Sequence, residues 1–159
     1  MEVIKRKSCR AILLTPENEV LLIKISNPTG KWSGWITPGG GLDEGESEIG
    51  GLTRELKEEL GFTLNAPATQ VWHRFHSFLW NDKMIEQHEI FYFVRANKFN
   101  PRGDTALTES EMMEFKEMRW WALQDLEKTN EEIAPRAFAK LLGDLLSHGL
   151  PKFPIEVGI

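Results

Sequence analysis

The chain has 159 residues, of which 41% are hydrophobic and 27% are charged, and its formal net charge is −5 at pH 7. This length suits one domain with a buried core. The negative charge and the lack of a basic stripe argue against a nucleic-acid footprint, and no segment approaches the roughly 20 apolar residues of a membrane span.

Cysteine usage and the first residues indicate the compartment. Cys9 is the only cysteine, so the chain forms no internal disulfide. The opening residues, MEVIKRKSCR, lack the apolar stretch of a secretory signal. We therefore expect a cytoplasmic protein.

The first predicted elements are two strands and a loop. Lys7–Leu14 and Val20–Ile25 have the apolar content of strands and flank a polar turn at residues 16–19. Ser26–Gly34 is rich in glycine, proline, serine and asparagine, which predicts a loop.

A glycine triplet, Gly39–Gly41, follows Pro38. Glycine-rich loops can cradle phosphates, but the lysine and hydroxyl residue of a P-loop are missing here. Glu44 occupies the position of the third glycine in a dinucleotide-binding fingerprint. The triplet therefore predicts a tight turn.

An acidic helix is predicted from about Ser47 to Leu60. At about 100° per residue, its leucines form one face, and Glu55, Glu58 and Glu59 form the neighbouring arc. Like charges at this spacing repel, and a divalent cation would reverse the repulsion. Oxygen donors favour Mg²⁺, Mn²⁺ or Ca²⁺ over zinc. A solvated acidic helix face explains the helix equally well.

The rest of the chain continues the alternation of strands and helices. We predict strands at Gln70–Leu79, Ile85–Arg95 and Glu117–Ala122, a polar irregular stretch at Lys98–Ser110, a short helix at Leu123–Lys128 and a longer helix from Pro135 to about His148. Strands interleaved with a few helices predict an α/β fold with helices on both faces of a sheet. No repeat or linker interrupts the chain, so we expect a single domain over residues 1–159.

Five residues separate Gly40 from Glu46, and a further seven separate Glu46 from Arg54–Phe62 (RELKEELGF). This pattern resembles a complete Nudix box. The resemblance extends more weakly to WITPGGG ahead of the box and to RWWALQDL near the end of the chain. It implies the Nudix fold, which is a mixed β-sheet in an α/β/α sandwich. One departure is Gly50-Gly51, where the family more often has alanine, and we interpret it as close packing of the helix on the sheet.

The resemblance also implies roles for single residues. The metal ligands would be the carbonyl of Gly39 and the carboxylates of Glu55, Glu58 and Glu59. Arg54 would orient these glutamates by ion pairing, while Gly40, Glu46 and Gly61 would shape the box. Glu55 is one candidate for the general base. An outside carboxylate is the other, with Glu114 first and Glu117, Glu111 and Glu89 behind it.

The activity implied by this resemblance is Mg²⁺-dependent hydrolysis of a diphosphate bond, with Mn²⁺ as a possible substitute. The substrate would be a small phosphorylated compound in which a nucleoside diphosphate is linked to another group. Nucleoside triphosphates, nucleotide sugars, ADP-ribose and dinucleoside polyphosphates all fit this description. Relatives often form dimers, and this analogy makes a homodimer one possible assembly of the chain.

Substrate contacts are less defined by the sequence. Lys24 matches a position where relatives place a basic substrate-binding residue, and Arg10 could serve similarly, although solvated surface cations explain both. Trp32 could stack on a base, and we expect its neighbour Trp35 to lie in the core.

Two other functions belong to the same fold. A non-catalytic nucleotide-binding or regulatory module typically loses box glutamates, and this chain keeps all of them. Isomerisation of an isoprenoid diphosphate resembles chemistry with an essential cysteine, and Cys9 lies outside the box. Both are therefore less favoured than hydrolysis.

Overall fold

A computed structural model describes residues 1–27, 30–101 and 113–159. Within these ranges it contains eight strands and three helices. The strands are β1 (Val3–Leu14), β2 (Glu19–Ser26), β3 (Ser33–Ile36), β4 (Gly39–Gly41), β5 (Ala68–Trp80), β6 (Lys83–Arg95), β7 (Glu114–Ala122) and β8 (Ile155–Glu156). The helices are α1 (Glu48–Leu60), α2 (Leu123–Lys128) and α3 (Phe138–His148).

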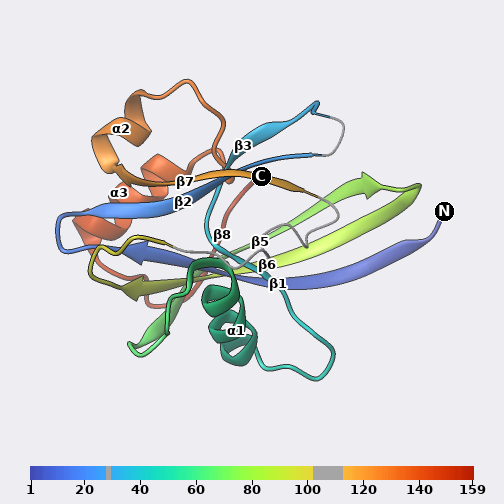
Figure 1. Ribbon diagram of the computed structural model, residues 1–159, viewed down its shortest axis with the longest axis horizontal. Helices are drawn as coiled ribbons and strands as arrows, with labels where there is room; N and C mark the ends of the chain where they lie inside the picture. The colour runs from blue at the N-terminus through green and yellow to red at the C-terminus, as the bar shows by residue number, and fades with distance from the viewer. Residues whose placement is uncertain (28–29, 102–112) are drawn as a thin grey trace.

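All eight strands belong to one mixed sheet. Its order is β3-β2-β1-β6-β5-β8, with β4 also pairing with β1 and β7 with β2. The β1–β6 and β5–β8 pairs are parallel, and the other pairs are antiparallel. The longest strands, β1, β5 and β6, run together toward the N-terminal end of β1 (Figure 1).

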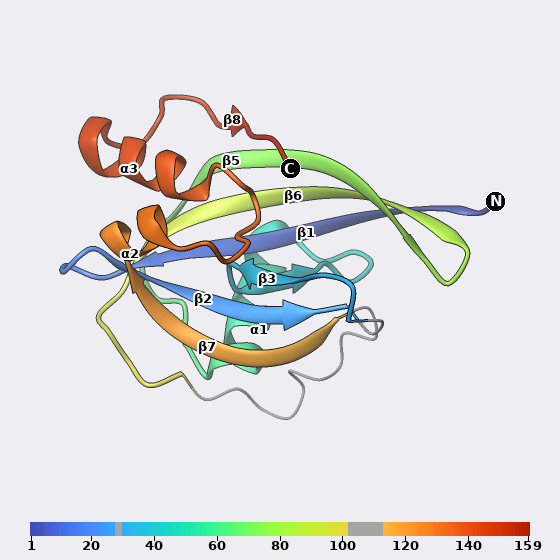
Figure 2. The same cartoon turned by 90° about the horizontal axis from the view of Figure 1, so that it is seen from above.

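Helices cover both faces of this sheet. Helix α1 lies on one side, whereas α2 and α3 lie together on the other (Figures 1 and 2). The predicted α/β/α sandwich is therefore confirmed. Among the described residues, no helix has both the length and the apolar character needed to cross a membrane.

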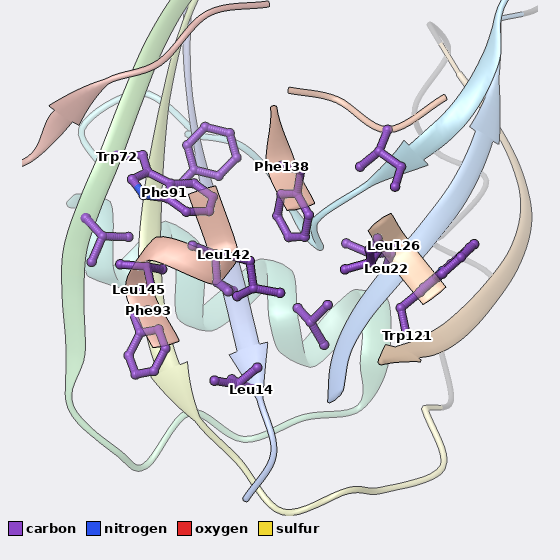
Figure 3. Packing of buried hydrophobic residues seen from close by; sticks show 14 of the residues in the cluster. Leu14, Leu22, Trp72, Phe91, Phe93, Trp121, Leu126, Phe138, Leu142 and Leu145 are labelled. Carbon is purple, nitrogen blue, oxygen red and sulfur yellow. The ribbon is translucent and has the colours of Figure 1, made fainter. Parts of the chain in front are cut away.

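Successive side chains of β1 point alternately into two separate cores. Ile12 and Leu14 belong to the core under α2 and α3, while Ala11 and Leu13 belong to the core under α1. This is the period-two pattern of a strand buried on both faces. In Figure 3 the buried side chains of α3 lie over those of the strands, and the labelled residues are Leu14, Leu22, Trp72, Phe91, Phe93, Trp121, Leu126, Phe138, Leu142 and Leu145.

Buried aromatic and sulfur-bearing side chains occupy both cores. Trp35 is 1% exposed and meets Trp121 edge-on with ring centroids 5.1 Å apart, which confirms its predicted core position. Cys9 is fully buried on the α1 side. Burial raises the pKa of the Cys9 thiol to about 12.

Helix α1 begins and ends with capping residues. The Ser47 hydroxyl accepts a hydrogen bond from the amide of Gly50 at 3.0 Å. At the other end Gly61 has φ 69°, and its N–H donates to the carbonyls of Leu56 and Lys57. A residue with a Cβ would be strained there, so glycine suits the end of this helix.

Three short strands were not predicted, and one helix begins later than predicted. Residues 33–36 form β3, which begins within the last two residues of the predicted loop, because they pair with β2. The expected glycine turn forms β4, which pairs with residues 8–10 of β1. Strand β8 has two residues and pairs with β5. Pro135 does not open α3, since its carbonyl accepts from the Phe138 amide in a turn that precedes the helix.

The glycine pair in α1 was interpreted as packing on the sheet, and this was wrong in detail. A Cβ on Gly51 would collide with Leu42, which lies in the loop between β4 and the helix. A Cβ on Gly50 would lie 2.8 Å from the Ser47 hydroxyl oxygen. Both glycines therefore fit the box loop and its cap rather than the sheet.

Candidate active site

The glycine strand β4 holds the first residues of the box against α1. It lies between β1 and the helix, with Gly39 opposite Arg10 and Gly40 opposite Cys9. Gly39 has φ 137°, and a Cβ there would collide with the Cys9 carbonyl. Only glycine combines this conformation with so close an approach of the strands.

Glu55 and Glu59 reach from α1 to this strand. A Cβ on Gly40 would lie 2.6 Å from the carboxylate carbon of Glu55, so Gly40 leaves the space that the carboxylate occupies. Glu59 accepts a hydrogen bond from the Gly39 amide at 2.8 Å. The structure therefore brings together Gly39, Gly40 and two of the three predicted carboxylates.

Both of these carboxylates hold their protons more tightly than a solvated glutamate. Burial raises the pKa of Glu59 to about 7, and the charges of Glu55 and Glu58 add to the effect. Burial also raises the pKa of Glu55, although Arg54 opposes the shift. Two desolvated carboxylates side by side are a common arrangement at functional sites.

Arg54 lies at the centre of the box. Its Nε and Nη2 donate to the two oxygens of Glu46 at 2.8 and 2.9 Å, and Nη1 donates to Glu55 at 3.1 Å and to Glu58 at 3.3 Å. Nη2 also donates to the Gly41 carbonyl at 3.1 Å. The hydrogen bond from Arg54 lowers the pKa of Glu46 to about 2. Arg54 thus links the loop to the helix without facing outward.

The donor set of this site fits a hard divalent cation. The groups near the strand are carboxylate and carbonyl oxygens, which are the ligands of Mg²⁺ and Mn²⁺. In the described part of the chain, no three acidic, histidine or cysteine side chains already converge as a metal-holding group. The Glu58 carboxylate faces Arg54, and a cation would compete with that guanidinium for it.

Arg10 lies inside the fold, so its interpretation as a solvated surface cation was wrong. Its side chain is 12% exposed, and Nε donates to the buried carboxylate of Glu89 at 2.7 Å. Glu89 also accepts from Arg74 at 2.6 Å. Burial would raise the pKa of Glu89, but the charge of Arg10, a hydrogen bond with His76 and the charge of Arg74 hold it well below its usual range. No local pattern in the sequence pointed to this cluster, whose members are 15 or 79 residues from Glu89.

The other predicted substrate contacts lie together at the β2–β3 edge. Lys24 pairs with Trp35 in the strand register, and its ammonium lies 3.0 Å from Glu131. The indole N–H of Trp32 donates to Glu132 at 2.9 Å. Both side chains are partly exposed and are bound by acids of the segment that follows α2.

The outside carboxylates are dispersed. Glu114 opens β7 opposite Ser26, and its exposed side chain lies 3.3 Å from the Lys116 ammonium. Glu117 is also exposed on β7, Glu89 is buried in its ion pairs, and Glu111 lies outside the described residues. The choice among them as a base stays a prediction.

The site places a glycine strand against paired helix carboxylates, in a mixed sheet that lies between helices. The family profile described as "NUDIX domain" matches residues 5–142, and this match identifies a hydrolase that acts on pyrophosphate bonds. The chain belongs to the Nudix family. Members of this family act on small nucleotide-type substrates and generally use divalent metals such as Mg²⁺.

Solved structures share the fold at low sequence identity. A MutT protein from Methanosarcina mazei Go1 is 19% identical with a TM-score of 0.68, covering 92% of this chain and 99% of that one. A MutT NUDIX hydrolase from Burkholderia pseudomallei is 26% identical with a TM-score of 0.62, covering 85% and 95%. A C. elegans Ap4A hydrolase is 20% identical with a TM-score of 0.61, covering 89% and 98%. No curated protein sequence matches the chain significantly.

Proposed function

We propose that this protein is a Mg²⁺-dependent pyrophosphohydrolase that cleaves the diphosphate bond of a nucleoside diphosphate linked to a second group. The observation that carries the proposal is the packing of Glu55 and Glu59 against Gly39 and Gly40. It gathers oxygen donors beside the backbone of β4, and such donors suit Mg²⁺ or Mn²⁺.

Four groups would hold the metal, namely the Gly39 carbonyl and the carboxylates of Glu55, Glu58 and Glu59. When bound, the ion supplies positive charge that offsets the charge of the diphosphate oxygens and makes water more acidic. Arg54 would keep Glu55 in place through its 3.1 Å contact while Glu46 fixes the other side of the guanidinium.

The chain must also supply a base. Glu55 is the first candidate inside the box, because its raised pKa makes it a stronger base than a solvated glutamate. It would take a proton from water, whose oxygen attacks phosphorus in line with the bridging oxygen. The bond to that oxygen breaks, which leaves a nucleoside monophosphate and a second phosphate compound. Glu114 is the proposed alternative base.

Lys24 and Trp32 are proposed to contact the nucleotide. Their contacts with Glu131 and Glu132 are partly exposed, and exposed pairs contribute at most about 1 kcal/mol, so a phosphate can displace them. Stacking of a base on a tryptophan contributes about 1–3 kcal/mol in nucleic-acid binders. Arg10, the third predicted contact, has its guanidinium committed to Glu89 and to backbone carbonyls.

The test is a phosphate-release screen with Mg²⁺ and with Mn²⁺. The compared proteins are named MutT and Ap4A hydrolase, so nucleoside triphosphates and dinucleoside polyphosphates come first, beside nucleotide sugars and ADP-ribose. Turnover of one class that needs the metal and disappears in Glu58→Gln supports the proposal. Silence across the panel, with ligands still raising the melting temperature, favours a binding module instead.

We propose further that residues 1–159 act as one domain in the cytoplasm. A homodimer through the outer part of β5 is proposed as well, because Phe75 and Leu79 are 58% and 63% exposed there. Light scattering of the purified protein tests it.

A further inference from the structure

Glu89 lies at the centre of a buried ionic cluster that joins three neighbouring strands. Its carboxylate accepts from Arg10 Nε on β1 at 2.7 Å and from Arg74 Nε on β5 at 2.6 Å. The side chains of Arg10, Arg74 and Glu89 are only 12%, 6% and 4% exposed. Burial of charge is costly unless each group keeps its partners, so these three side chains hold one another in fixed positions.

Arg10 differs from Arg74 in what the rest of its guanidinium does. Arg10 Nη1 donates to the carbonyl of Thr37 at 3.3 Å and to that of Gly39 at 3.2 Å. Glu89 binds the Nε edge of the same planar group. Because a guanidinium presents its donors in a rigid fork, fixing one edge also fixes the direction of the other.

Gly39 is therefore held on both sides of its peptide backbone. Its carbonyl accepts from Arg10, and its amide donates to Glu59 at 2.8 Å. Its φ is 137°, and glycine adopts positive and negative φ about equally. The contacts of Gly39, rather than its own preference, therefore keep its backbone in this conformation. The contacts of Gly39 thus connect the ionic cluster in the sheet with a carboxylate of α1.

We propose that Arg10, braced by Glu89, is a positioning residue that fixes the Gly39 backbone for the carboxylate site. This rests on the proposed function in one respect, namely that the Gly39 carbonyl serves as a metal ligand. Arg10 then acts through Gly39 and touches neither substrate nor the reacting atoms. Loss of an outer partner of a metal ligand typically weakens metal binding by about 10–100-fold.

Arg74 provides a matched control. It shares the Glu89 carboxylate with Arg10 and is at least as buried. It lies on β5, however, which is separated from β1 by β6, and its described hydrogen bonds do not reach residues 37–41. Arg74→Gln and Arg10→Gln therefore disturb the same cluster, but only Arg10→Gln removes the side-chain hydrogen bond to the Gly39 carbonyl.

The first experiment measures hydrogen exchange of the Gly39 amide by NMR in the metal-free protein. We expect exchange at least about tenfold faster in Arg10→Gln and unchanged in Arg74→Gln, after both are corrected for global stability. Arg10→Lys keeps the charge beside Glu89 and loses the fork, so it should fall between them. If Arg10→Gln does not fold, exchange of the Gly39 amide in Arg10→Lys is compared with the wild type instead, and this comparison tests the proposal. Equal exchange in the arginine variants and the wild type would overturn it.

The second experiment measures Mn²⁺ binding by electron paramagnetic resonance. Arg10→Gln and Glu89→Gln should each bind about 10–100-fold more weakly, while Arg74→Gln stays within about twofold of the wild type. Equal weakening by Arg10→Gln and Arg74→Gln would mean that the cluster supports only the fold, and it would overturn the positioning role.

The two proposals can fail separately. If the wild type neither binds Mn²⁺ nor releases phosphate, the proposed function fails, while the exchange comparison still decides whether Arg10 fixes Gly39. If the wild type is active and Gly39 exchange is the same in all variants, the positioning role fails alone.

Discussion

Glu58 is more exposed than Glu55, with which it shares the Arg54 guanidinium. Its side chain is 43% exposed and pairs with Arg54 at 3.3 Å, whereas Glu55 is 20% exposed and lies against Gly40. We expect Glu58→Gln to lower kcat by on the order of 10²-fold or more, because under the proposed function it removes a negative charge that holds the metal. The melting temperature should change by only a few degrees, since little packing is lost.

Glu44→Gln is the control for this prediction. Glu44 is an exposed carboxylate in the loop of the same box. It should leave both kcat and the melting temperature near the wild-type values. Near-normal turnover in Glu58→Gln would remove Glu58 from the site.

At the residue scale, local and distant contacts differ in how far the sequence pointed to them. The family resemblance implied ion pairs between Arg54 and the box glutamates, and Arg54 contacts Glu55 at 3.1 Å and Glu58 at 3.3 Å. The partner of Arg10 could not be predicted, because Glu89 is 79 residues away and only the parallel pairing of β1 with β6 brings them together. A single sequence contains no signal for such a pairing.

Glycines inside helices provide a test at the level of elements. A Cβ on Gly143 in α3 would meet Leu123 at 4.0 Å, an ordinary contact, whereas a Cβ on Gly51 in α1 would collide with Leu42. Gly143→Ala should therefore raise the free energy of unfolding by up to about 1 kcal/mol, as helix propensity predicts. Gly51→Ala should lower it, because overpacking typically costs about 1–3 kcal/mol. Urea unfolding of both variants measures the difference, and equal signs would contradict it.

The loop–helix connection should also weaken in acid. The pKa of Glu46 falls from its ordinary value of 4.5 to about 2 in the folded chain, because of its hydrogen bond from Arg54. The contribution of Glu46 to stability is therefore complete above about pH 4.5 and is lost as the pH falls toward 2, since the unfolded chain binds the proton first. The stability advantage of the wild type over Glu46→Gln should shrink across this window. Urea unfolding at several pH values measures it, and a constant difference would contradict the ion pair.

Elements were predictable where they were long and periodic. Helix α1 has both a leucine face and capping residues, and it was predicted almost to the residue. Strand β3 has four residues and β4 consists of three glycines, so neither has a periodicity of its own. Both are strands because β2 and β1 offer hydrogen bonds at their edges.

At the level of the whole molecule, the two cores share β1, β2 and β6, so we expect them to unfold together. Leu52 lies in the core under α1 and Leu142 in the core under α3, and both are fully buried. Leu52→Ala and Leu142→Ala should each lower the free energy of unfolding by about 2–5 kcal/mol. Tryptophan fluorescence and far-ultraviolet circular dichroism should report one coincident transition in both variants. Two separate transitions would show that the halves unfold independently.

The layered architecture was predictable, and the strand order was not. Alternating strands and helices predicted a sheet with both faces covered, because each element must bury an apolar face. The position of β7 next to β2 depends on a pairing between residues about a hundred positions apart. Composition and periodicity do not contain that information.

Cys9 has a practical consequence for labelling. Since the only thiol of the chain is fully buried and stays protonated at neutral pH, maleimide reagents should not modify it in the folded protein. The chain can thus be labelled at an added cysteine without first replacing Cys9. One cysteine placed on the surface, for example at Lys57 on α1, would carry a single fluorophore or spin label without any change to the residues around Gly40.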